Sequence, residues 1–219
     1  MLSRPTASDS RGLAAGRSGI TVEAGPGALI AVQGASGAGR TCLLLALTGR
    51  MRATEGTATV GGARLPKQAA AVRRISAVAD VAGATDLDPA LTAGEHLRER
   101  ALLQRRFGDS LRGLLRPRRE RTADAGRRVG SALDAAGLDL AALPKGARTV
   151  VRDLDRPQTL RLSVALALVV RPHLLGVDGT DLKLSEAERA NAWALLRSLA
   201  DARTTVVAVC GEAPGGTVR

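Results

Sequence analysis

Aromatic residues, lysine and cysteine are all scarce in this chain of 219 residues. Phe107 and Trp193 are its only aromatic residues, so the sequence offers no platform on which successive nucleic-acid bases could stack. Apolar residues still make up 45% of the chain, which is ordinary for a globular protein. We therefore expect a core built mainly from alanine, valine and leucine.

The two cysteines, Cys42 and Cys210, show no metal-ligand spacing and predict no disulfide framework. The amino terminus does not resemble a signal peptide, and no apolar run approaches the roughly 18 residues that a membrane span needs. The apolar run LSVALALVV at 162–170 is too short to span and predicts a buried helix. These absences predict a cytoplasmic protein, which could bind peripherally to the cytoplasmic face of a membrane through a partner.

Basic residues outnumber acidic ones by 32 to 21, which gives a net charge of +11. A coding bias towards arginine and alanine is one explanation, and a surface that attracts phosphates or an anionic membrane is another. The arginines are concentrated in one segment, where they indicate either a solvated helical face or a contact surface. They are Arg105, Arg106, Arg112, Arg116, Arg118, Arg119, Arg121, Arg127 and Arg128.

Apolar runs alternate with helical patterns in the first and last thirds of the chain, which predicts a parallel α/β sheet with helices on both faces. The middle third, about 85–160, has helical periodicity and little strand propensity, and predicts a helical subdomain. Residues 1–18 lack any apolar period and predict a flexible leader. The strands expected in the sheet are 28–33, 75–79, 173–178 and 204–209.

The glycine-rich sequence GASGAGRTC, residues 34–42, has the spacing of a phosphate-binding loop, G-x-x-x-x-G-K-[ST], with Arg40 at the lysine position. Arginine keeps the charge, but its guanidinium is broad and planar where an ammonium is compact. A simple turn is the alternative, and the strand before the loop and the helix after it favour a nucleotide site. The residues predicted to bind nucleotide are Gly34, Ala35, Ser36, Gly37, Ala38, Gly39, Arg40, Thr41 and Cys42.

Four further segments follow this loop: GTATVGG at 56–62, LDPALTAGEHL at 87–97, LDRPQ at 154–158 and RPHLLGVD at 171–178. In this order the chain resembles the nucleotide-binding subunit of an ATP-binding cassette (ABC) transporter. The resemblance implies an α/β P-loop NTPase core with a parallel sheet, a small antiparallel β segment and a helical subdomain. It also implies ATP and Mg²⁺ as cofactors, a membrane-spanning partner subunit, and a homo- or heterodimer with another cassette.

The resemblance sets the expected boundaries of an ABC-type nucleotide-binding domain at 19–212, with a short tail at 213–219. It also assigns three residues to the metal. Thr41 and Asp178 stand at the magnesium-associated positions, and Asp80 replaces a glutamine and could still approach the metal or its waters.

Other family positions are substituted. The glutamate that polarises the attacking water corresponds to Gly179, the switch histidine to Gly211, and the last aspartate of the D-E-P-T-S-A-L-D region to Ser185. In the L-S-G-G-Q signature, Asp155 replaces a serine and would repel a γ-phosphate, while Pro157 removes a backbone donor. Arg156, which replaces a glycine, would partly offset that repulsion.

These substitutions lead us to assign no catalytic residue. General-base and water-positioning groups each account for about two or more powers of ten in rate. The sequence therefore predicts a subunit that binds ATP weakly, without adenine stacking, and hydrolyses it little or not at all. Two alternatives stay open: an active ABC ATPase that uses Arg40 and Asp80 in unusual roles, and a basic ABC-like module that binds nucleic acid outside transport. Nucleic acid is not the partner we expect, because the resemblance places the helical subdomain against membrane subunits.

Overall fold

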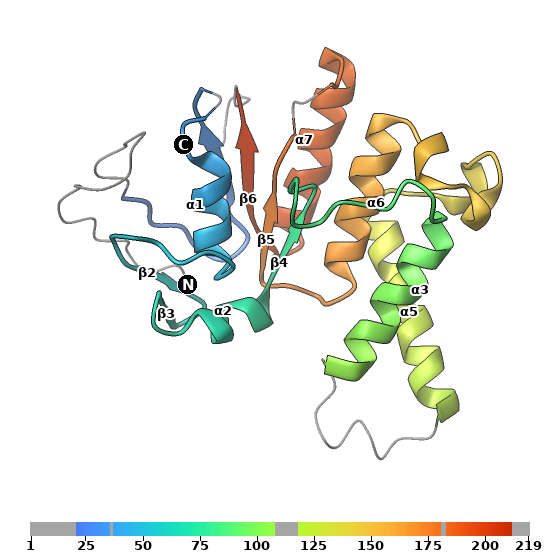
Figure 1. The fold of residues 1–219 in the computed structure, drawn as a ribbon, viewed down its shortest axis with the longest axis horizontal. Helices are drawn as coiled ribbons and strands as arrows, with labels where there is room; N and C mark the ends of the chain where they lie inside the picture. Colours follow the sequence, from blue (N-terminus) through green and yellow to red (C-terminus); the bar gives the residue numbers. More distant parts are fainter. Residues whose placement is uncertain (1–20, 36, 108–117, 181–182, 212–219) are drawn as a thin grey trace. The chain divides into compact units, whose positions relative to one another are not determined.

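The computed structural model describes residues 21–35, 37–107, 118–180 and 183–211 (Figure 1). The predicted leader at 1–18 and tail at 213–219 lie outside these ranges, as does Ser36. The chain divides into two compact units, one formed by Met1–Val81 with Pro172–Arg219 and the other by Ala82–Arg171.

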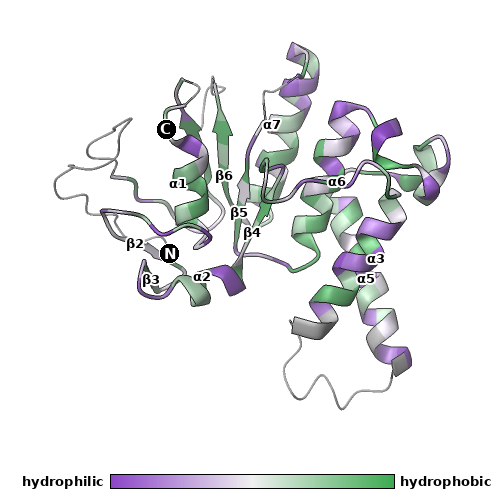
Figure 2. Cartoon of the chain, in the orientation of Figure 1, coloured by the Kyte–Doolittle hydropathy of each residue, from purple (hydrophilic) through white to green (hydrophobic). Residues whose placement is uncertain are grey.

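The first unit is built on a four-stranded parallel sheet with the strand order β1-β6-β5-β4. The strands are β1 (Leu29–Gln33), β6 (Thr205–Cys210), β5 (Leu174–Val177) and β4 (Ser76–Ala79). All residues of β4, β5 and β6 are buried, and β4 and β6 are green along their length in Figure 2. Continuous apolar strands of this kind are what a sheet covered on both faces requires. The predicted parallel sheet is confirmed.

A separate antiparallel pair joins β2 (Ala58–Val60) to β3 (Ala63–Leu65). This pair is the small antiparallel segment that the resemblance implied. The short helix α2 (Ala69–Ile75) follows it and runs directly into β4. The sequence reading placed no helix there.

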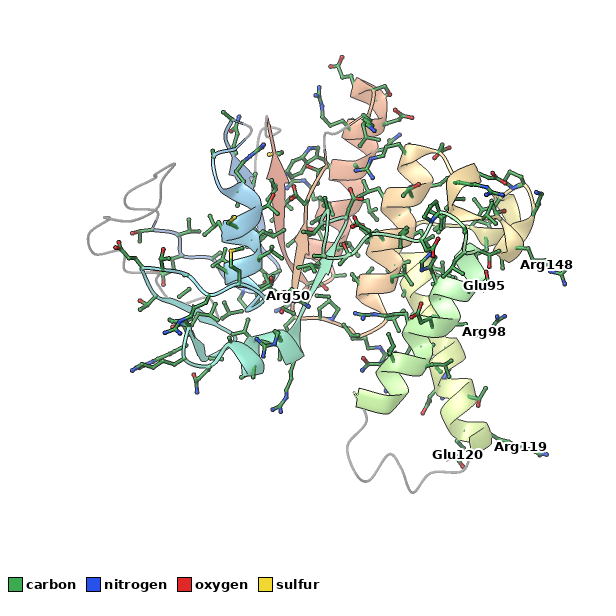
Figure 3. The ribbon with its side chains drawn as sticks, viewed as in Figure 1. Arg50, Glu95, Arg98, Arg119, Glu120 and Arg148 are labelled. Atoms are coloured by element: carbon green, nitrogen blue, oxygen red, sulfur yellow. The ribbon has the colours of Figure 1, made fainter. Side chains whose placement is uncertain are left out.

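Two longer helices complete the first unit, α1 (Arg40–Leu47) and α7 (Glu186–Asp201). Leu44 of α1 is fully buried and packs closely on β5, since a Cβ at Gly176 would lie 2.8 Å from Leu44 Cδ1. Just after α1, the guanidinium of Arg50, labelled in Figure 3, donates to Ser76 Oγ at 2.9 Å and to Ser76 O at 3.1 Å. These contacts hold the middle of α1 and the residues after its carboxyl end against the sheet.

The second unit is helical, as predicted for the middle of the chain. Its main helices are α3 (Ala93–Phe107), α5 (Arg118–Ala136) and α6 (Arg156–Leu168). The short 3₁₀ turns η1 (Leu140–Ala142), η2 (Gly146–Arg148) and η3 (Val151–Asp153) lie between α5 and α6. Seven residues of α6 are buried, which confirms the predicted buried helix. The core of this unit contains Ala93, Leu97, Leu138, Leu143, Val151 and Leu162.

Candidate nucleotide-binding site

The carboxyl ends of the four parallel strands meet at one edge of the sheet. Gln33, the last residue of β1, pairs in register with Cys210, the last residue of β6. Ala79 at the end of β4 pairs with Val177 at the end of β5, and the Asp178 N–H donates to Ala79 O at 3.2 Å. Ligands of open parallel sheets bind outside this edge. The glycine loop, Asp80, Asp178 and Gly211 all leave the sheet here.

The described part of the glycine loop leaves open space beside its glycines and leads directly into a helix. Gly37 and Gly39 have φ of 79° and 76°, in the left-handed region that favours glycine. A Cβ at either position would meet no atom within 4 Å, so side chains there would fill open space rather than clash. α1 begins at Arg40, directly after Gly39, with no side-chain cap and no acidic residue in its first turn. Its first N–H groups, from Arg40, Thr41 and exposed Cys42, are free of intrahelical acceptors by geometry and favour an anion.

Two of the three predicted metal residues contact each other. Thr41 Oγ1 in the first turn of α1 donates to Asp178 Oδ2 at 2.6 Å, although 137 positions separate the two residues. Asp178 Oδ1 accepts from the Gly179 N–H at 2.8 Å. A hydroxyl and a carboxylate beside a phosphate cradle are the oxygen ligands that Mg²⁺ accepts. Asp80, the third residue, follows the neighbouring strand β4 at the same edge, with a φ of 56°.

The guanidinium of Arg40 is bound to the protein's own backbone. Its Nη1 donates to the carbonyl oxygen of Cys210, at the end of β6. The next residue is Gly211, where the family resemblance expects the switch histidine. Arg40 is the only cation of the predicted glycine loop. Its guanidinium is therefore held at the end of β6, next to Gly211.

The segment after Asp178 begins with a left-handed backbone conformation. Gly179 has a φ of 65°, where a residue with a side chain is strained by about 1–2 kcal/mol. Thr180 is fully buried and its Oγ1 donates to Val209 O at 2.9 Å, which fixes the segment to β6. A glutamate at 179 would have to adopt this strained conformation or change the path of the chain.

The structure shows that Asp155 of the signature segment is a helix cap. Its carboxylate caps α6: Asp155 Oδ1 accepts from the Gln158 N–H at 2.7 Å, and Gln158 Oε1 accepts from the Asp155 N–H at 3.1 Å. The expectation that this carboxylate would repel a γ-phosphate stays a prediction, and the capping role was not predicted. The signal was present as D-x-x-Q before an apolar helix, which is a capping box. Pro157 fits the same motif, because proline is tolerated in the first helical turn.

The resolved pKa shifts that involve acids lie at helix caps. Backbone and side-chain hydrogen bonds from Ser185 lower the pKa of Glu188 at the start of α7. The same two kinds of bond from Thr92 lower the pKa of Glu95 at the start of α3. Burial lowers the pKa of Arg100 on α3, whose Nε donates to Leu166 O at 3.0 Å.

Among the described residues, no group of three or more His, Cys, Asp or Glu side chains could hold a metal, so a metal at the sheet edge would depend on the Thr41–Asp178 pair.

The parallel sheet, the glycine loop that opens a helix, and the threonine–aspartate pair define a P-loop nucleotide-binding protein. Residues 18–180, well over half of the chain, match the family model described as ABC transporter. The chain belongs to the ABC transporter family and is a nucleotide-binding subunit of the ABC ATPase type. ATP with Mg²⁺ is the cofactor of this family, whose cassettes generally dimerise and work with membrane-spanning components.

Two curated relatives share the name Nod factor export ATP-binding protein I. The protein from Cupriavidus metallidurans is 31% identical over 189 residues, which cover 86% of this chain and 55% of the relative. The protein from Cupriavidus pinatubonensis is 32% identical over 175 residues, covering 80% of this chain and 47% of the relative. The chain thus spans about half the length of these relatives.

Solved structures agree on the fold. The dimeric bacterial ABC transporter cassette MJ0796 superimposes with a TM-score of 0.69 at 20% identity, covering 97% of this chain and 88% of that one. cbiO1 from Clostridium perfringens, part of the ABC transporter complex cbiONQ, gives 0.68 at 16% identity, covering 89% and 71%. At these identities the structures establish the fold alone, so residue roles must be argued from the geometry above. Among the described residues, no helix is long and apolar enough to cross a membrane.

Proposed function

We propose that this subunit binds Mg²⁺–ATP weakly and hydrolyses it little or not at all. One contrast supports the proposal. Thr41 and Asp178 form an oxygen pair at 2.6 Å beside an open glycine loop, while the next residue, Gly179, has neither a side chain nor a conformation suited to one. Asp178 can thus take part in binding magnesium, while the adjacent Gly179 cannot activate water for hydrolysis.

The binding half of the site fits magnesium and phosphate. Residues 34–42 would hold the phosphates through backbone N–H groups, and Thr41, Asp178 and Asp80 would hold the metal or its waters. Magnesium, when bound, supplies positive charge that neutralises and orients the phosphate oxygens. The protein contributes the open loop, the helix amino end and the fixed threonine–aspartate pair.

Two features weaken binding. Trp193 is buried in α7, and neither it nor Phe107 precedes the glycine loop in the sequence, where the family places an adenine-stacking aromatic residue. Arg40 must also give up its bond to the Cys210 carbonyl before its guanidinium can reach a phosphate. Breaking a hydrogen bond from a charged donor costs about 1–3 kcal/mol, which reduces the free energy of nucleotide binding.

Hydrolysis lacks the groups that position water. Gly179 and Gly211 provide no side chain to polarise the nucleophile or to contact a γ-phosphate. Loss of a positioned general base alone reduces rate by about 10²–10⁴. We propose that the protein acts as the non-hydrolysing or regulatory member of its complex.

The cap of α6 bears on whether the partner cassette is a second copy of this chain or a different protein. Because the Asp155 carboxylate already accepts from its first turn, the helix amino end is occupied by the chain's own anion. It is poorly suited to receive a phosphate of a nucleotide held by a second copy. We propose a heterodimer with a cassette of intact signature, attached to membrane-spanning subunits at the cytoplasmic face. The names of the two curated relatives support an export complex.

Isothermal titration calorimetry tests the binding half of this proposal. Wild-type protein should bind ATP more tightly with magnesium than with EDTA, and Asp178→Asn should lose at least tenfold of the magnesium-dependent part. Asp201→Asn, on the exposed end of α7, is the matched control and should bind as wild type. No detectable ATP binding by wild type would contradict a retained phosphate cradle.

A further inference from the structure

Two side chains from different segments bind the last two carbonyl oxygens of β6. The Arg40 guanidinium, at the start of α1, donates to Cys210 O, and Thr180 Oγ1 donates to Val209 O at 2.9 Å. Val209 and Cys210 are both buried, in a strand that lies between β1 and β5 in the sheet. The end of β6 is therefore tied to α1 by one hydrogen bond and to the segment after β5 by another.

The two donors adjoin the residues that we predict to bind the metal. Arg40 directly precedes Thr41, and Thr180 lies two positions after Asp178. Thr41 and Asp178 are themselves joined by the 2.6 Å hydrogen bond between their side chains. The amino end of α1, which favours an anion, begins at Arg40 itself. A phosphate held by the glycine loop would therefore lie beside a guanidinium that is engaged by a backbone carbonyl.

We propose that the hydrogen bond from Arg40 to Cys210 is a latch that a bound phosphate releases. A guanidinium binds phosphate more strongly than it binds a neutral carbonyl, because both partners are charged and two parallel bonds can form. When the guanidinium turns to the phosphate, the Cys210 carbonyl loses this donor, while the bond from Thr180 to Val209 stays in place. Occupancy of the glycine loop is thereby transmitted to the last residue of β6 and not to the whole strand.

This latch rests on the proposed nucleotide binding, since the phosphate is what releases it. A ligand shifts a conformational equilibrium only by binding one of the two states more tightly. Here the bonds between Arg40 and the phosphate exist only in the released state, which gives the ligand that preference. The empty site ties α1 to β6, and the occupied site separates them.

Thiol labelling measures the latch at the residue that it holds. Cys42 and Cys210 are the only cysteines of the chain and lie in different tryptic peptides, so mass spectrometry can follow each during labelling of the full chain with N-ethylmaleimide. Cys210 is buried, and its labelling rate reports local opening of the end of β6. Saturation with ATP and magnesium, verified by titration calorimetry, should raise the Cys210 labelling rate at least threefold.

Two variants separate the latch from other effects of the nucleotide. Arg40→Gln should label at Cys210 at least threefold faster than wild type without nucleotide, and saturating ATP should accelerate it no further. Thr180→Val, which removes the other side-chain bond at the end of β6 and keeps the shape of threonine, is the matched control. It should also label faster than wild type, yet ATP should still accelerate it, because Arg40 is intact. Circular dichroism and thermal melting verify that each variant is folded.

Bound nucleotide could shield the thiol only to the same extent in all three proteins, so the comparison of their responses to ATP is decisive. An equal response in wild type and Arg40→Gln, both saturated with ATP, would overturn the latch. An unchanged labelling rate in Arg40→Gln without nucleotide would also overturn it, since the bond would then not restrain β6. Absence of ATP binding in the calorimeter would instead contradict the proposed function, and ligand control of the latch would fall with it.

Discussion

The guanidinium of Arg40 donates to the carbonyl of Cys210, so the cation that follows the glycine loop is engaged by the protein's own backbone. A lysine ammonium is compact and carries no planar fork, and it would be less well matched to that carbonyl. In the proposed function, the site keeps its phosphate cradle and lacks the groups that would act on the terminal phosphate. Gly179 has a φ of 65°, so a residue with a side chain at this position would be strained.

Replacing Arg40 by lysine should tighten ATP binding modestly, by less than tenfold, because the charge is freed from Cys210 while adenine still lacks a stacking partner. Phosphate release should stay at background. Titration calorimetry on Arg40→Lys measures the gain, with Arg64→Lys at an exposed site as the matched control. Arg40→Gln, which removes the charge, should bind more weakly than wild type. Unchanged affinity in both Arg40 variants would mean that this side chain has no contact with the nucleotide.

Helix ends determine which segments are available to a ligand. α1 begins without a side-chain cap and leaves its amino end open, whereas α6 and α7 both begin with complete capping boxes. The open end belongs to the glycine loop and the closed end of α6 belongs to the signature segment. The amino end of α1 is therefore open to an anion, whereas the amino end of α6 is occupied by the chain's own carboxylate.

The cap of α7 should depend on pH with a definite sign. Hydrogen bonds from Ser185 lower the pKa of Glu188 below the ordinary glutamate value of 4.5, so the folded state favours the ionised carboxylate. Its stabilising contribution is therefore present above about pH 4.5 and is lost as the pH falls through the lower folded pKa. Melting temperatures of wild type and Glu188→Gln should differ at pH 7 and converge towards pH 3. A constant difference across this range would contradict the shift.

Removing the other half of this capping box gives a reference for that comparison. Ser185→Ala should lower stability by about 1 kcal/mol near neutral pH. For a chain of this size that corresponds to a fall of roughly 2–4 °C in melting temperature. The loss should shrink towards pH 3, because the Ser185 hydroxyl is one of the groups that lower the pKa of Glu188.

At the scale of the whole molecule, the capped α6 predicts how copies associate. Wild-type protein with ATP and magnesium should sediment as a monomer, because a second copy would present Asp155 and Pro157 where a phosphate needs neutral amide donors. Replacing Asp155, Arg156 and Pro157 by serine and two glycines should increase ATP-dependent association. Sedimentation velocity distinguishes the two states. A tight ATP-dependent homodimer of the wild type would contradict the assignment of α6.

The sequence predicted the fold where apolar runs were long and continuous. β4, β5 and β6 are such runs, and periodicity also identified α6 and α7. It missed α2, a short helix of seven residues that runs into β4 with no turn between them. It missed the capping role of Asp155, because this residue was compared with the glycine-rich signature and not with the D-x-x-Q spacing of a capping box.

The sequence also brought Thr41 and Asp178 to one site only through the family resemblance. Their 2.6 Å contact depends on the strand order, which places the end of β5 beside the start of α1. The hydrogen bond from Arg40 to Cys210 joins positions 170 apart, and no local sequence pattern predicts it. The left-handed φ of Gly179 was equally hidden, because glycine adopts either sign of φ freely.

The central claim is that ATP is bound and not hydrolysed, and a single sample can test it. Protein in excess over ATP labelled on the γ-phosphate, with magnesium, should retain part of the ATP in equilibrium dialysis, and that ATP should stay intact over many minutes. Released phosphate should not exceed that from Asp178→Asn, because Gly179 and Gly211 cannot position water. Retention of ATP with background phosphate release would support the proposed function. Brisk phosphate release that is abolished by Asp178→Asn would show an active ATPase and contradict it.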